Sequence, residues 1–189
     1  MNSKPNITLS YVLYENMGND QGKLKHLFEH AFPVEERPPF SFHLMCRNQN
    51  IYGVYYKNEF AALMDTVVYK DIIYLYFLAV KKKFRNKGVA SKILEDLFAK
   101  YDKDYRIYLL MEEIDEKYSN YQQRIDRAHF YTKRGFKISN IKINEFEVIY
   151  SLLNNNKEVS YNDHMEVFEY LLRENGFYPT YKKNTFEMK

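Results

Sequence analysis

The longest run of apolar positions in the chain lies near its middle and predicts a buried strand. Residues 72–80 (IIYLYFLAV) are all apolar or aromatic and rich in β-branched types. A run of this length and composition is typical of a strand that is buried on both faces of a sheet. After it the apolar residues change to helical spacing, in a stripe made of Val89, Ile93, Leu94, Leu97, Phe98 and Tyr101. We therefore expect a central strand over 72–80 and a helix that begins at Val89.

Before the central strand, the pattern predicts three strands and two helices. The expected strands cover residues 7–14, 50–56 and 60–68. Asn19 or Asp20 caps the first expected helix and Pro33 ends it. The second helix covers 40–46, with Pro39 at its first position.

After the helix at Val89, the pattern predicts a strand, a helix and a hairpin, followed by a C-terminal helix. The expected strands cover residues 105–111, 136–141 and 145–152. The C-terminal helix follows a polar linker over 154–157, and Ser160 with Asp163 forms the pattern of a capping box at its start. His164 falls on the apolar stripe of this helix, where we expect a packing residue.

This order of elements predicts an α/β fold with a mixed, largely antiparallel central sheet flanked by helices. A chain of 189 residues is long enough for one well-buried domain and short for two. We expect that domain to cover residues 1–152, with a C-terminal helical extension over 153–189 packed on it.

Charge and composition narrow the classes of function. Lys and Arg number 28 against 25 Asp and Glu, a net charge of +3, which is too mild for the basic face of a nucleic-acid-binding protein. The apolar run over 72–80 is far shorter than the ~20 residues of a membrane span, and the N-terminus lacks the apolar core of a signal peptide. Cys46, the single cysteine, allows no intrachain disulfide and no multi-cysteine metal site. We expect a cytoplasmic protein with no nucleic-acid, membrane or metal partner; a homodimer stays open.

The turn between the central strand and the next helix has the features of a phosphate-binding site. It holds five cationic side chains and no carboxylate, and Gly88 stands at the helix start. A helix N-terminus attracts anions through its unpaired N–H groups and its dipole, and a glycine lets a phosphate approach the backbone closely. The glycine spacings of a mononucleotide P-loop and of a Rossmann turn are both absent.

The residues from Arg85 to Ala90, Arg-x-x-Gly-x-Ala, resemble the pyrophosphate-binding motif of the GNAT superfamily of N-acetyltransferases. A second landmark of that family is similar to residues 127–136, a helix that bears Ala-x-x-Tyr and ends in Gly-Phe. The order and spacing of the two landmarks also fit, and the resemblance covers about residues 51–152. Each piece alone has a bland interpretation, as a solvated turn, a helix C-cap or a packing tyrosine, but together they favour the family.

The resemblance implies an acetyl-CoA-dependent enzyme and assigns roles to residues. The backbone of Leu78 and Val80 would pair with the pantetheine arm, and a backbone N–H near Leu78 would polarise the thioester carbonyl. Tyr131 would be the general acid that protonates the leaving thiolate, because its usual pKa of ~10 keeps it protonated at neutral pH. The residues expected to bind the rest of the cofactor are Arg85, Asn86, Lys87, Gly88, Val89, Ala90, Ser91 and Phe130.

Two departures from the family leave the general base open. Many members place a carboxylate two residues before the leucine of the central strand, where this chain has Tyr76. The asparagine often found three residues before the helix alanine is replaced by Ile125. Glu112 and Glu113, at the end of the strand over 105–111, are the candidates for the base; a solvated acidic strand end is the alternative.

Three functions follow in order of preference. The first is an N-acetyltransferase that moves an acetyl group from acetyl-CoA, the co-substrate, to a primary amine of a small molecule or peptide by direct attack in a ternary complex. The alternative is a non-catalytic acyl-CoA-binding or regulatory module that kept the phosphate site and lost a base. A nucleic-acid binder that uses the cations of 81–87 is set aside. Residues 32–37, which include Glu35, Glu36 and Arg37, are candidates for the acceptor side.

Overall fold

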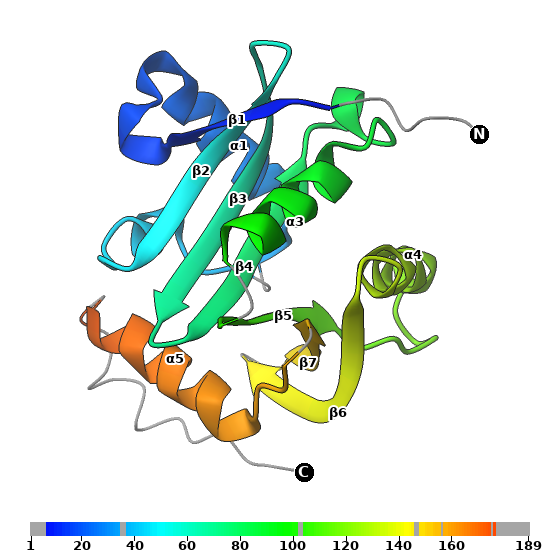
Figure 1. The fold of residues 1–189 in the computed structure, drawn as a ribbon. Helices are drawn as coiled ribbons and strands as arrows, with labels where there is room; N and C mark the ends of the chain where they lie inside the picture. The colour runs from blue at the N-terminus through cyan, green and yellow to red at the C-terminus, as the bar shows by residue number, and fades with distance from the viewer. Residues whose placement is uncertain are drawn as a thin grey trace.

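A single seven-stranded sheet with helices on both faces forms the protein (Figure 1). The computed structural model describes residues 7–34, 37–101, 104–145, 148–155, 157–174 and 176. The strand order is β1-β2-β3-β4-β5-β7-β6, and every neighbouring pair is antiparallel except β4 and β5, which are parallel. The prediction of an α/β fold with a mixed, largely antiparallel sheet is confirmed.

Most elements lie within a few residues of their predicted places. The strands are β1 Leu9–Leu13, β2 Gln49–Tyr56, β3 Glu59–Tyr69, β4 Ile72–Val80, β5 Arg106–Glu112, β6 Phe136–Glu145 and β7 Val148–Asn155. The helices are α1 Gln21–Ala31, α2 Phe40–His43, α3 Val89–Lys100, α4 Tyr121–Thr132 and α5 Tyr161–Glu174. Both ends of β4 and the start of α3 agree with the sequence pattern.

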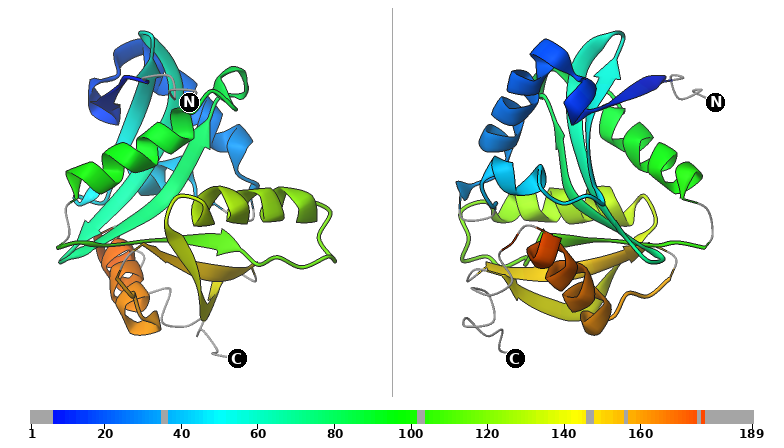
Figure 2. Two further views of the ribbon diagram at one scale, coloured as in Figure 1. Left: turned by 45° about the vertical axis from the view of Figure 1, so that its right-hand side comes forward. Right: turned by 90° about the vertical axis from the view of Figure 1, so that its left-hand side faces the viewer.

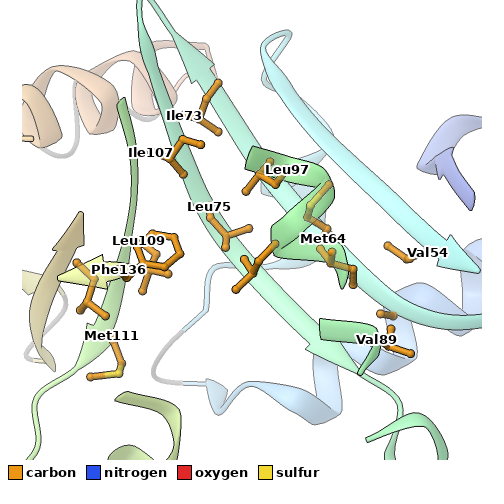
Figure 3. Packing of buried hydrophobic residues seen from close by; sticks show 14 of the residues in the cluster. Val54, Met64, Ile73, Leu75, Val89, Leu97, Ile107, Leu109, Met111 and Phe136 are labelled. Carbon is orange, nitrogen blue, oxygen red and sulfur yellow. The ribbon is translucent and has the colours of Figure 1, made fainter. Parts of the chain in front are cut away.

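Alternating side chains of the central strands build a core on each face of the sheet. Helices α3 and α4 cover one face, where Ile73 and Leu75 of β4 pack with Leu97 of α3 (Figure 3). Helices α1 and α2 cover the opposite face of β3 and β4, and α5 covers that face nearer β5 (Figure 2). Because both faces of β4 are covered, its sequence is an unbroken apolar run.

Several predicted boundaries were wrong. The strand expected over 145–152 is β7, Val148–Asn155, and Glu145 belongs to β6. The hairpin strand β6 runs to Glu145 instead of 141. Lys142 and Asn144 are exposed on this edge strand, and their polar side chains had suggested a turn. The pairing register with β7 also shifts after Ile138. Helix α2 ends at His43, and Pro39 lies at its N-cap instead of its first helical position.

The C-terminal helix α5 is joined to the sheet by a buried polar contact. Its capping box is present: Ser160 Oγ accepts from the backbone N–H of Asp163 at 3.1 Å, and Asp163 Oδ2 accepts from the N–H of Ser160 at 2.9 Å. His164 is fully buried and lies 3.0 Å from the hydroxyl of Tyr108 on β5 and 3.1 Å from the carboxylate of Glu145. It is the packing residue that the sequence predicted. β7 runs on to Asn155, past the expected domain boundary at 152.

Replacing Ser160 with Ala should destabilise the fold by about 1 kcal/mol, because the first turn of α5 loses its side-chain acceptor. Chemical denaturation monitored by circular dichroism measures this change. The exposed Ser10 of β1 offers a matched control, and Ser10→Ala should change stability by less than about 0.5 kcal/mol. Equal effects of the two substitutions would show that the capping box contributes nothing to stability.

Candidate functional site

A cleft opens in the middle of the sheet where β4 and β5 separate. The two strands pair only from Ile72 to Tyr74, against Arg106 to Tyr108. Beyond Tyr74 a cavity of about 340 Å³ lies between them. Its lining consists of Ala31, Phe32, Pro33, Leu75, Tyr76, Leu78, Ala79, Val80, Arg85, Leu109, Leu110, Glu112, Asn120, Gln123, Arg127 and Tyr131. Four elements therefore meet at this cleft: the end of α1, strands β4 and β5, and helix α4.

A β-bulge in β4 lies where the separation begins. Leu75 pairs with Thr66 and Phe77 pairs with Asp65, so Tyr76 is an extra residue without a partner of its own on β3. A bulge bends the strand that contains it and increases the local twist. The bend directs the second half of β4 away from β5.

The backbone of Leu78 and Val80 faces the cleft. The N–H of Lys81 donates to the carbonyl of Ala61 at 2.8 Å, which makes this a hydrogen-bonded pair of the β3–β4 ladder. Hydrogen-bonded pairs alternate along an antiparallel ladder, so Ala79 also bonds to β3. Leu78 and Val80 then direct their N–H and C=O groups to the other side, where β5 has departed. The carbonyl of Val80 accepts from Nε of Arg85 at 3.1 Å. An extended ligand arm can pair with the remaining groups as an added strand would.

The turn before α3 has the geometry of an anion site. Gly88 is the N-cap of α3 in the left-handed conformation, with φ of 82°, and Asn86 also has a positive φ of 60°. No side chain among the described residues caps this helix end, so the first N–H groups of α3 are left for a ligand. A Cβ on Gly88 would lie 2.5 Å from Cδ1 at the end of the Ile7 side chain, which can shift, so it is the left-handed backbone conformation that favours glycine here.

A second, larger cavity of about 910 Å³ adjoins this turn, between α3 and the residues after α4. Asn86, Lys87, Gly88 and Ser91 line it, and so do further cations that the sequence analysis did not single out: Lys92, Lys133 and Arg134. Arg134 donates to Ser91 Oγ at 3.0 Å and its guanidinium lies 3.8 Å from the ring centroid of Phe130. Phe130 thus supports Arg134 and lines neither cavity.

Tyr131 lies on the face of α4 that lines the cleft. Burial raises the pKa of its hydroxyl to about 12; the nearby charge of Arg127 opposes this shift and that of Glu112 adds to it. The phenol is therefore protonated throughout the neutral range and is suited to donate a proton.

The two candidate bases lie in different places. Glu112 is 3% exposed, lines the cleft and forms an ion pair with Arg127 of α4. Glu113, the residue directly after β5, does not line the cleft and pairs instead with Lys142 of β6 at 3.0 Å. The structure thus brings Glu112 together with Tyr131 and does not bring Glu113 to them.

The part of the cleft next to the end of α1 is aromatic. Phe32 and Pro33 line it, as expected, together with Tyr76. Burial raises the pKa of Tyr76 well above its usual range, so this residue is a poor substitute for the family's carboxylate base. Arg37 donates to the carbonyl of Phe32, the C-cap residue of α1, at 3.1 Å, so its side chain binds the C-terminal end of this helix. Glu35 and Glu36 lie outside the described residues.

Sequence reasoning missed Arg127, the partner of Glu112. Asn120, Gln123 and Arg127 precede Tyr131 on one face of α4, at intervals of three or four residues. Once Tyr131 was proposed to face the site, helical spacing could have identified Arg127, one turn earlier.

Comparisons with known proteins identify the family and agree with the fold. No curated protein matches the chain, but residues 42–138, more than half of it, match the family described as the acetyltransferase (GNAT) domain. Three of the similar solved structures, all below 25% identity, agree in fold. A putative GNAT acetyltransferase from Bacteroides thetaiotaomicron has 16% identity and a TM-score of 0.67, over 91% of this chain and 99% of that one.

The other two are ligand complexes. Naa50 of Arabidopsis thaliana, in complex with a bisubstrate analogue (CoA-Ac-MVNAL), has 20% identity and a TM-score of 0.59, over 80% of this chain and 99% of that one. A GNAT family acetyltransferase from Elizabethkingia anophelis with acetyl-CoA bound has 17% identity and a TM-score of 0.51, over the same shares of the two chains. On the match of its sequence and its fold, the chain belongs to the GNAT acetyltransferase family.

Proposed function

We propose that this protein is an acetyl-CoA-dependent N-acetyltransferase that acts on a primary amine. The observation that supports this most is the cleft between β4 and β5, which the backbone N–H groups of Leu78 and Val80 face and which Tyr131 and Glu112 line. The anion site before α3 lies at the same end of β4. The structure from Elizabethkingia anophelis, similar in fold, has acetyl-CoA bound.

The groups of the cleft provide what direct transfer needs. The anion site holds the pyrophosphate, and the strand-like pairing with Leu78 and Val80 fixes the thioester. The N–H of Leu78 stabilises the oxyanion that forms when the amine nitrogen attacks the thioester carbon. Glu112 accepts the proton that the amine loses, directly or through water. The C–S bond breaks as Tyr131 donates its proton to the departing thiolate.

The site of action that fits this chemistry is the cytoplasm, where acetyl-CoA is available. Within the part of the chain that the structure describes, none of the helices combines the length and the apolar character that crossing a bilayer requires.

Release of CoA thiol in the presence of acetyl-CoA and a panel of primary amines tests the proposal. Turnover of at least one amine, well above hydrolysis without acceptor, is the expected result. Acetyl-CoA that binds by calorimetry but is consumed with no amine would favour the non-catalytic binding module instead. Absence of both binding and turnover would contradict either function.

Replacing Gly88 with Ala should weaken acetyl-CoA binding by at least tenfold. The added Cβ occupies the space beside the backbone where a phosphate approaches, and it strains a residue with φ of 82°. Isothermal titration calorimetry measures the affinity. Gly18→Ala is the matched control, since Gly18 also has a positive φ (53°) but has open space around it and lies far from the cleft in sequence. Gly88→Ala with normal affinity would refute the anion site.

Replacing Tyr131 with Phe should lower kcat by roughly 10²–10⁴-fold, because only the proton donor is removed. The KM for acetyl-CoA should hardly change, which is the pattern of a group used mainly in the transition state. A tyrosine that serves only packing predicts near-normal turnover.

The pH profile provides an independent check on Tyr131. Because its pKa is raised to about 12, the proton donor persists as pH rises through 8 to 10, and kcat should not fall in that range. A decline of kcat near pH 8–9 that disappears in Tyr131→Phe would contradict this assignment.

A further inference from the structure

Arg127 is the one cation at the acceptor end of the cleft among the described residues. Three charged side chains line the described cleft: Arg85, Glu112 and Arg127. Arg85 belongs to the phosphate-binding end, where its Nε donates to the carbonyl of Val80 at 3.1 Å. Glu112 and Arg127 lie together beside Tyr131, and their opposite charges offset each other.

Only one nitrogen of Arg127 is used in this pair. Nη1 donates to both carboxylate oxygens of Glu112. The other edge of the guanidinium, formed by Nε and Nη2, has no hydrogen-bond acceptor among the described residues. The Arg127 side chain is 37% exposed, against 4% for Glu112, and it lines the cleft, so a ligand in the cleft can reach it.

The free edge has the shape of a carboxylate site. Nε–H and Nη2–H point in parallel directions, and this fork matches the two oxygens of a carboxylate in a bidentate pair. A cleft that recognised a polycationic amine would need carboxylates without partners. The single carboxylate of the described lining is already paired with Arg127.

We propose that the acceptor is an amino acid-like compound, whose primary amine and carboxylate are a few bonds apart, and that Arg127 binds the carboxylate. This inference depends on the proposed acetyltransferase function and specifies its substrate class. The acceptor carboxylate pairs with Nε and Nη2 of Arg127. Its amine then lies beside Glu112 and Tyr131. Glu112 of β5 is the ion-pair partner of Arg127, and Tyr131 follows Arg127 by one turn of α4.

The test compares amino acids with their own carboxamides as acceptors, for example alanine, leucine, phenylalanine and β-alanine. The pairs differ in the carboxylate charge, and CoA thiol release gives kcat/KM for each. We expect a preference for the acid of at least tenfold in the wild-type protein. The amine of an α-carboxamide is less basic, so its neutral form is more abundant at pH 7.5 and this bias opposes the expected preference.

Variants of Arg127 distinguish a role in binding the acceptor carboxylate from a purely structural role. Arg127→Gln should reduce the preference for the acid to less than about threefold and leave the KM for acetyl-CoA unchanged. Arg127→Lys keeps the charge without the fork and should retain an intermediate preference. Lys117→Gln, which removes an exposed cation from the β5–α4 connection outside the cleft, should keep the wild-type ratio.

The outcomes distinguish this inference from the proposed function. Turnover of acids and carboxamides at similar rates by the wild type overturns the role of Arg127 and leaves the acetyltransferase function in place. A change in the KM for acetyl-CoA, rather than in the acceptor preference, would assign Arg127 to the cofactor. No turnover of any primary amine would overturn both.

Discussion

The bulge at Tyr76 is the feature on which the site depends, because it separates two parallel strands in the middle of a sheet. Backbone N–H and C=O groups inside a protein need hydrogen-bond partners, and a central strand normally finds them on both sides. Beyond the bulge, β4 keeps its partner on β3 and loses the one on β5. The N–H groups of Leu78 and Val80 and the carbonyl of Leu78 are therefore open to a ligand that can act as a strand, while the carbonyl of Val80 accepts from Arg85. A sheet without this bend would have closed the cleft with its own hydrogen bonds.

The candidate functional groups around this opening lie on helices α3 and α4 and on strand β5. The start of α3, with Gly88 as an uncapped left-handed N-cap, is the proposed anion site. The face of α4 provides Tyr131 and Arg127, and β5 adds Glu112. Burial raises the pKa of Tyr131, which keeps the proposed acid protonated. Glu112 is also buried, and it forms an ion pair with Arg127.

Local features of the site were readable from the sequence, and long-range ones were not. The apolar run of β4 and the glycine at Gly88 have short-range causes, so their positions were predicted correctly. The bulge at Tyr76 was invisible, because an unbroken apolar run has no alternation that a register shift could interrupt. The ion pair of Glu112 and Arg127 joins strand β5 to helix α4. It could not be predicted, because the sequence does not specify the path of the connection between these two elements. The sequence could not distinguish Glu112 from Glu113 as candidate bases. In the structure Glu112 lines the cleft and Glu113 pairs with Lys142.

Residue-resolved amide hydrogen exchange with and without saturating acetyl-CoA tests the central claim most directly. The amides of Leu78 and Val80 face the gap left by β5, and those of Phe77 and Ala79 face β3. We predict that acetyl-CoA protects Leu78 and Val80 strongly and changes Phe77 and Ala79 little, so the control lies in the same strand. Bound acetyl-CoA that leaves the exchange of Leu78 and Val80 unchanged would contradict the role of the cleft.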